Sequence, residues 1–321
     1  MSSTAASPKR SLGLFYCLAF VSLEAIQAVY FGSVFQRMDS FLLGSAIFGL
    51  AIACSLLWVA WRDRGQFARA RREWRILAKA GIGTAVSWAA YFVALQLIEP
   101  AVAYTVFSGL VPLTILAAAR RGVPEASSAA GRGSRLGHML IAVSLIYLCL
   151  ASIAGLTGFE RGGMVGGIGG VIALLATGLS STWVIFYCRR LGSAGVTATA
   201  LFGLRYLPYV ALAGAAAAIG IDAKPPVPSW EITEALVIGL ALVATPSYLV
   251  QRAIPLVSPL LIGLAGALGP FLVFGLQAVE GRIAYSSWTL VGLVVYCLGT
   301  VVAATSEALP GRPVPGMSTG S

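Results

Sequence analysis

The stretch FLLGSAIFGLAIACSLLWVAW, residues 41–61, decides the fold class because it contains no charged side chain. A transmembrane α-helix needs about 20 consecutive apolar residues to cross the hydrocarbon core of a bilayer. The whole chain keeps this character: 58% of its 321 residues are hydrophobic and 11% are charged, against roughly 25% charged residues in soluble domains. Such a chain cannot cover a folded surface with polar groups, so lipid must be the solvent for most of it.

Comparable apolar segments recur along the chain, and only helices are plausible for them because lipid offers no partner to unpaired backbone groups. We expect them near residues 13–33, 41–61, 77–97, 101–119, 138–156, 164–187, 196–220, 233–250, 255–277 and 286–305. The first segment is longer than the apolar region of a signal peptide, about 7–15 residues, so it is expected to be retained. The prediction is an all-α integral membrane protein with ten transmembrane helices.

Basic residues alternate between the two sides of the membrane that these segments define. With the N-terminus in the cytoplasm, the inside segments hold seventeen Lys and Arg residues and the outside segments hold four. Cytoplasmic loops carry such an excess, so we expect a multi-pass protein of the inner cell membrane with both termini in the cytoplasm. The net charge of +10 is attributed to orientation and to anionic lipid, not to nucleic acid.

The second half of the chain resembles the first. Residues 46–50, AIFGL, recur as ALFGL at residues 200–204, and Pro112 recurs as Pro270 at a nearly equal offset. Repeats of five helices insert in opposite orientations, and inverted repeats are typical of transporters. We therefore divide the chain into a disordered cytoplasmic N-terminus (1–11), two inverted five-helix repeats (12–157 and 158–305) and a disordered cytoplasmic C-terminus (306–321).

Three short motifs follow one another along these repeats. They are YFVALQ at residues 91–96 followed by Pro112, Leu204-Arg205-Tyr206, and VEGR at residues 279–282 after Pro270. With them the chain resembles the drug/metabolite transporter superfamily, specifically its EamA-type members, over nearly its whole length. The resemblance implies ten helices, a central cavity lined by helices one to four and six to nine, and peripheral fifth and tenth helices. The family's substrates range over amino acids, nucleobase-like compounds and other small organic molecules.

Two formal charges fall inside the predicted helices away from their ends, and a charge at the bilayer centre costs at least roughly 2.5–3.5 kcal/mol. Glu24 lies near the middle of the first segment, and Arg205 lies at a similar depth in the seventh. Arg205 offers a permanently charged, planar donor fork suited to a substrate carboxylate. Glu24 is expected to bind an amine on the same substrate or to carry a proton that couples transport to the gradient. The alternative is a structural ion pair that locks helix one against helix seven.

Polar and aromatic side chains complete the predicted substrate site, because aromatic walls can hold an organic cation or an apolar group. The candidates are Gln27, Tyr30, Trp88, Tyr91, Tyr104, Trp183, Tyr187 and Tyr248. Aromatic residues also pack cores and mark the membrane interface, so each of them has a purely structural interpretation as well.

Residues for enzymatic chemistry are scarce in this sequence. The five cysteines lie in apolar segments without metal-type spacing, and His138 is the one histidine. An intramembrane enzyme would need several acid–base partners together, so we expect no enzyme, no metal and no cofactor. We predict an exporter of a small organic metabolite, such as an amino acid, that works by alternating access, with protons and membrane lipid as further partners. A nucleotide-sugar or organic-phosphate exchanger and a non-transporting membrane scaffold stay open as alternatives.

Overall fold

Long helices dominate the computed structural model, which describes residues 8–123, 132–253, 256 and 265–308. In chain order they are α1 (Pro8–Val34), α2 (Ser40–Arg62), α3 (Gly65–Arg72), α4 (Trp74–Leu97), α5 (Pro100–Arg120), α6 (Arg132–Ile153), α7 (Gly163–Ser193), α8 (Ala198–Arg205), α9 (Leu207–Ala218), α10 (Ser229–Ala253), α12 (Gly269–Glu280) and α13 (Ser287–Ala308). The β-structure of the described residues is one isolated bridge between Ile98 and Glu160. The all-helical prediction is confirmed for this part of the chain.

Nine helical segments in the described part of the chain are long and apolar enough to cross a membrane, with α8 and α9 together forming one of them. They indicate a multi-pass membrane protein. The predicted segment 255–277 falls partly outside the described residues, and its described helix, α12, has 12 residues, which is shorter than a span. Ten helices and inverted repeats therefore stay predictions, as do the membrane and the orientation.

The seventh predicted segment, 196–220, is divided at Tyr206 into α8 and α9. Thr197 caps α8 by accepting a hydrogen bond from the Ala200 backbone N–H. Pro208 follows two residues after the break, where its missing N–H and its ring disfavour a continuous helix. The break leaves Arg205 at the last position of α8, inside the bundle.

Two further boundaries differ from the predictions. α1 begins at Pro8, within the segment predicted to be disordered, because proline is tolerated in the first helical turn, where no N–H donor is needed. The inside connection between residues 62 and 77 contains the short helix α3, and α4 begins at Trp74. The sequence predicts a loop over this connection.

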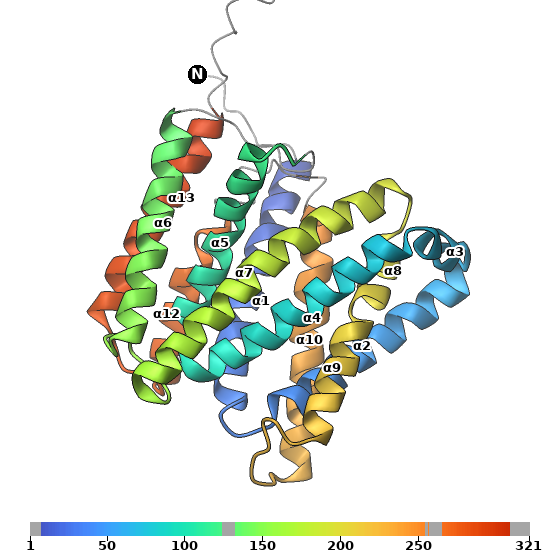
Figure 1. The fold of residues 1–321 in the computed structure, drawn as a ribbon, viewed down its shortest axis with the longest axis horizontal. Helices are drawn as coiled ribbons and strands as arrows, with labels where there is room; N and C mark the ends of the chain where they lie inside the picture. Colours follow the sequence, from blue (N-terminus) through green and yellow to red (C-terminus); the bar gives the residue numbers. More distant parts are fainter. Residues whose placement is uncertain (1–7, 124–131, 254–255, 257–264, 309–321) are drawn as a thin grey trace, which may run out of the picture.

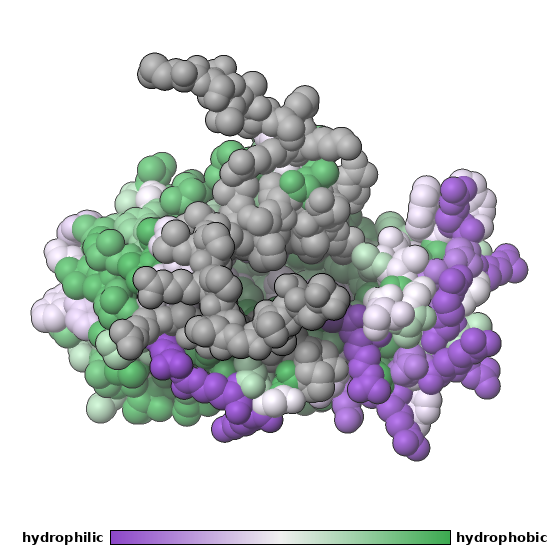
Figure 2. All heavy atoms as spheres, turned by 90° about the horizontal axis from the view of Figure 1, so that it is seen from above, coloured by the Kyte–Doolittle hydropathy of each residue, from purple (hydrophilic) through white to green (hydrophobic). Residues whose placement is uncertain are grey.

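Figure 1 shows how the helices group. α6 and α13 run side by side at one edge of the bundle, and α4 crosses close to α7 through the middle. α1 packs on α10, while α2 packs on α8 and α9. Seen from the end that carries α3, hydrophobic residues cover the α6 and α13 side and hydrophilic residues gather at the opposite side (Figure 2). The two helices expected to be peripheral thus lie together at an edge.

Candidate functional site

Arg205 has no carboxylate partner among the described residues. Its Nη1 donates a hydrogen bond to Cys188 Sγ of α7 (3.2 Å), and its Nη2 donates to the Tyr206 hydroxyl (3.3 Å). Its Cζ lies 4.8 Å from the centroid of the Tyr206 ring. Its Nε is buried and has no hydrogen-bond partner in the described part of the chain. A permanent charge inside the bundle is therefore held by neutral acceptors and one aromatic ring.

Aromatic rings from two other helices contact this arginine's neighbour, Tyr206. Trp88 of α4 donates its Nε1–H to the Tyr206 hydroxyl at 3.1 Å. Phe48 of α2 stacks on Tyr206 with ring centroids 4.9 Å apart and meets Trp88 edge-on at 4.8 Å. The Tyr206 hydroxyl thus accepts two hydrogen bonds, one from Trp88 and one from Arg205.

Glu24 is half-buried on α1, and the Tyr104 hydroxyl of α5 donates a hydrogen bond to its Oε2 at 3.1 Å. Tyr104 is buried against Gly269 of α12, where a Cβ would lie 2.5 Å from its ring. The ring occupies the space that the missing side chain leaves, which fixes the hydroxyl toward Glu24. In the described part of the chain Glu24 forms no ion pair.

Trp88 and Tyr91 connect the surroundings of the two charges. They lie nearly one turn apart on α4 with ring centroids 6.3 Å apart. Tyr91 packs against Phe107 of α5, the helix whose Tyr104 bonds to Glu24, and Trp88 bonds to Tyr206 beside Arg205. We call Phe48, Trp88, Tyr91 and Tyr206 the aromatic array. The structural ion pair considered from the sequence is not formed: Arg205 contacts this array at Tyr206, whereas Glu24 bonds to Tyr104 of α5.

Two candidates on α1 have structural partners instead. Gln27 is buried and donates a hydrogen bond to the Leu242 carbonyl of α10 at 3.0 Å, which ties these two helices together. Tyr30 packs against Phe31 with ring centroids 5.7 Å apart. Neither of them contacts the aromatic array through a ring or hydrogen bond between described residues.

The remaining candidates lie on α7 and α10. Trp183 stacks on Tyr187 at 6.3 Å and is 40% exposed. Tyr187 packs on the small cluster that contains Leu191 and Ala200, on the α3 side of the bundle. Tyr248 belongs to α10, and its side chain lies outside the described residues. The structure thus brings Tyr104 to Glu24 and Trp88 to Tyr206 beside Arg205, while Tyr187 precedes Cys188, the residue that accepts a hydrogen bond from Arg205.

Sequence reasoning missed three contributors to the site. Tyr206 follows Arg205 directly in the motif Leu204-Arg205-Tyr206, so its place in the sequence could have predicted that it belongs to the site. Phe48 and Cys188 had no such signal, because their roles depend on how α2 and α7 pack against α8.

A third buried charge, Glu99, lies between α4 and α5. Its side chain is fully buried and accepts hydrogen bonds from the Gly158 backbone N–H (2.8 Å), the Thr289 hydroxyl (2.6 Å) and the Gln277 amide. Burial raises the pKa of Glu99, and these donors offset part of that effect. The carboxyl joins α5, α12, α13 and the connection after α6.

A polar network closes the end of the bundle opposite α3. Lys224 forms an ion pair with Asp222 (2.5 Å) and donates to Gln96 Oε1 of α4 (2.9 Å). Asp222 Oδ2 accepts hydrogen bonds from the Ser40 hydroxyl (2.8 Å) and backbone N–H (2.9 Å) at the start of α2. We call Ser40, Gln96, Asp222 and Lys224 the far-end network. It joins residues of the first predicted repeat to residues of the second.

Comparisons with known proteins add evidence on the fold. No family model matches the chain. No curated protein matches it either. Ten chains of solved structures are similar to it. One, described as "Crystal structure of protein", has a TM-score of 0.59 and 22% identity, covering 94% of this chain and 97% of that chain. At this identity the likeness shows a shared fold alone.

Proposed function

We propose that the protein exports a small organic metabolite across the membrane by alternating access. The observation that carries the proposal is that Glu24 and Arg205, two opposite charges inside the bundle, have aromatic residues beside them and no ion-pair partners among the described residues. Charges inside membrane segments are expensive and mark substrate or ion pathways. Two opposite charges separated by aromatic rings suit an amino acid or a related zwitterion.

The geometry of Arg205 supports a carboxylate ligand. Its Nε is buried and unpartnered, and its Nη atoms bond to a thiol and a phenol, which are weak acceptors for a guanidinium. A carboxylate would replace these acceptors with a charge-assisted, bidentate pair of hydrogen bonds. Glu24 at the other end would accept a hydrogen bond from the substrate amine, or carry a proton for coupling. The rings of Trp88 and Tyr91 would contact the rest of the molecule.

The far-end network supports alternating access. It links the connection before α10 to the first turn of α2 and to the last turn of α4. Opening the bundle at this end would separate these groups, so the network would act as a closure that breaks in each cycle. The resemblance to EamA-type transporters supports the same mechanism, because their inverted repeats exchange conformations.

A nucleotide-sugar or organic-phosphate exchanger is the second candidate function. The small number of cations at the aromatic array disfavours it. Arg205 is the one cation that contacts the aromatic array in the described part of the chain. A phosphate with two negative charges would need more than one guanidinium or ammonium partner. A non-transporting scaffold would bind no substrate and show no flux.

The test is flux in reconstituted vesicles, after a thermal-shift screen of amino acids, polyamines, nucleobases and aromatic compounds has identified a ligand. We expect Arg205→Gln and Glu24→Gln to lower efflux of that ligand at least tenfold. Arg37→Gln and Glu231→Gln, which change the same groups in a surface ion pair, are matched controls and should leave flux unchanged. Wild-type flux in both site variants would remove the two charges from the mechanism.

A further inference from the structure

The connection between α2 and α4 concentrates positive charge at one end of the bundle. Residues 62–79 contain seven Lys and Arg residues and two acidic ones, which gives a net charge of +5. Much of this charge lies on α3. Helix α3 is held in place by Gln66, whose Oε1 accepts a hydrogen bond from the Thr197 backbone N–H (2.9 Å), and by buried Ala70. Its charges therefore have a defined position on the protein.

Three arginines of this connection have no acidic partner within the described residues. Asp63 pairs with Arg69 at 2.7 Å. Arg64 uses its Nε to donate to the Ala60 carbonyl at 2.9 Å, which leaves its two terminal nitrogens for another acceptor. Arg71 and Arg72 are exposed and form no ion pair in this part of the chain.

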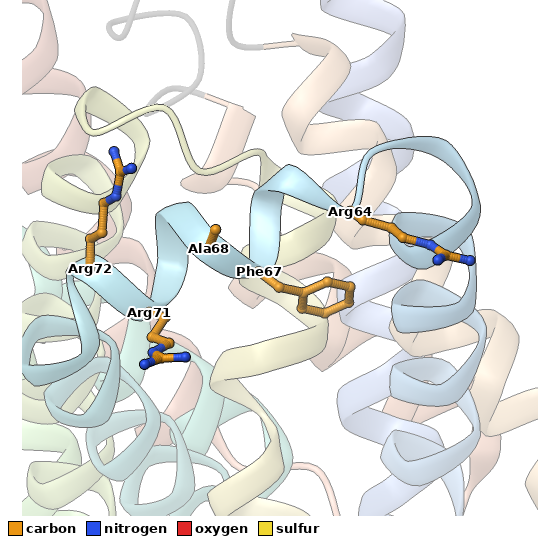
Figure 3. Close-up of a pocket in the computed structure, with 5 residues that line it drawn as sticks. All are labelled: Arg64, Phe67, Ala68, Arg71 and Arg72. Carbon is orange, nitrogen blue, oxygen red and sulfur yellow. The ribbon is translucent and has the colours of Figure 1, made fainter.

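These arginines surround a shallow hollow. It has a volume of about 540 Å³ and is lined by Arg64, Phe67, Ala68, Arg71 and Arg72. Figure 3 shows Arg71 and Arg72 pointing to opposite sides near the end of α3, with Arg64 and Phe67 near its start. Three guanidinium groups and an aromatic ring thus line one hollow of the surface.

Exposed tryptophans place the hollow at the level of lipid headgroups. Trp58 and Trp61 near the end of α2 and Trp74 at the start of α4 are 55%, 76% and 60% exposed. The Arg75 guanidinium lies 5.6 Å from the centroid of the Trp74 ring. Exposed tryptophan beside arginine at the ends of spans is typical of a membrane–water interface. A ligand of this hollow would therefore meet both the headgroup layer and the apolar layer below it.

We propose that the hollow on α3 binds the phosphate of an anionic phospholipid, such as phosphatidylglycerol. A guanidinium fork from one of the lining arginines matches a phosphodiester in charge and in the geometry of its oxygens. Phe67 supplies an apolar contact for the glycerol and the first carbons of the acyl chains. This proposal does not rest on the proposed transport activity.

The lipid would also act on the candidate functional site through the structure. Gln66 of α3 bonds to Thr197, the residue that caps α8, and α8 ends at Arg205. A lipid that holds α3 in place would hold the start of α8 as well. We therefore expect bound lipid to stabilise the folded protein.

The experiment uses the full-length, detergent-purified protein titrated with phosphatidylglycerol or phosphatidylcholine in mixed micelles, read out as the midpoint of thermal unfolding. Phosphatidylglycerol should raise the midpoint and phosphatidylcholine should not. The triple variant Arg64→Gln, Arg71→Gln, Arg72→Gln should need at least tenfold more phosphatidylglycerol for half of the effect. The matched control is Arg120→Gln, Arg121→Gln, Arg135→Gln, which removes three exposed charges outside the hollow and should respond like the wild type.

Three outcomes would overturn the proposal. The first is an equal loss of response in the two triple variants, which would indicate general charge attraction. The second is an unchanged response in the hollow variant. The third is the same stabilisation by inorganic phosphate or glycerol phosphate, which would indicate a soluble anion as the ligand. If the glutamine variant does not fold, the triple lysine variant keeps the charge and should still lose most of the response, because it lacks the guanidinium forks.

Discussion

Replacing Glu99 with alanine tests how much stability depends on one buried carboxyl between α4 and α5. The substitution removes the acceptor of three hydrogen bonds, from Gly158, Thr289 and Gln277. Each buried donor left without a partner costs about 1–3 kcal/mol. The Thr289 hydroxyl can rotate toward another acceptor, whereas the Gly158 backbone N–H and the Gln277 amide cannot easily do so. We expect Glu99→Ala to lower the free energy of unfolding by about 2–6 kcal/mol.

The assay is unfolding of the detergent-solubilised protein by sodium dodecyl sulfate, followed by far-ultraviolet circular dichroism. Glu231→Ala is the matched control, because this carboxylate belongs to an ion pair whose Arg37 partner is 59% exposed. Surface pairs of this kind contribute about 0–1 kcal/mol. If Glu99→Ala destabilises the protein no more than Glu231→Ala does, the reasoning from buried donors is wrong.

The same carboxyl predicts a pH dependence. Burial raises the pKa of Glu99 above its ordinary value of 4.5. Between pH 4.5 and the raised pKa of the folded state, the folded protein therefore keeps a proton that the unfolded chain has lost. The resulting stabilisation is complete below pH 4.5 and is lost as the pH rises through the folded pKa. The unfolding midpoint of the wild type should fall relative to that of Glu99→Gln across this range. Parallel pH profiles of the two proteins would contradict the prediction.

Other predictions concern packing and the two networks. Gly137→Ala should lower the free energy of unfolding by about 1–3 kcal/mol, because a Cβ there would lie 2.3 Å from a backbone nitrogen of α13. The control is Gly214→Ala, whose Cβ would have no atom within 4 Å and which should leave the thermal unfolding midpoint unchanged or raise it. Tyr206→Phe removes the acceptor of Trp88 Nε1 and should shift the tryptophan emission spectrum, so an unchanged spectrum would count against the array. Lys224→Met should speed hydrogen exchange in the connection that contains it, and wild-type protection there would show that the far-end network is not a closure.

Part of the candidate site could be predicted because charge is rare in apolar segments. Glu24 and Arg205 stand out for this reason alone, and the structure places Glu24 beside Tyr104 of α5 and Arg205 beside the adjacent Tyr206. Trp88 and Tyr91 were identified as neighbours on α4, but their connection to Tyr206 depends on how α4 crosses α8. The hydrogen bond from Gln27 to α10 could not be predicted, since no local pattern specifies a partner 215 residues away.

Glu99 was missed because hydropathy locates the ends of spans only approximately. It lies between two apolar segments, where a carboxylate is ordinarily exposed, and it is buried here by α12, α13 and the connection after α6. The short helix α3 was missed for a related reason. Many of its residues are basic, and its two buried residues, Gln66 and Ala70, do not form the apolar stripe by which a helix is recognised in a sequence.

The sequence by itself determined that this chain is helical and apolar enough to cross a membrane many times, because hydropathy and the hydrogen-bonding demand of the backbone act over one segment at a time. It also showed where charge enters those segments. Only the tertiary structure decided which charges meet, since helices that are apolar on all sides carry no pattern that specifies their inward face. Glu24 therefore bonds to Tyr104, and Arg205 to Cys188 and Tyr206, through packing that no single segment encodes.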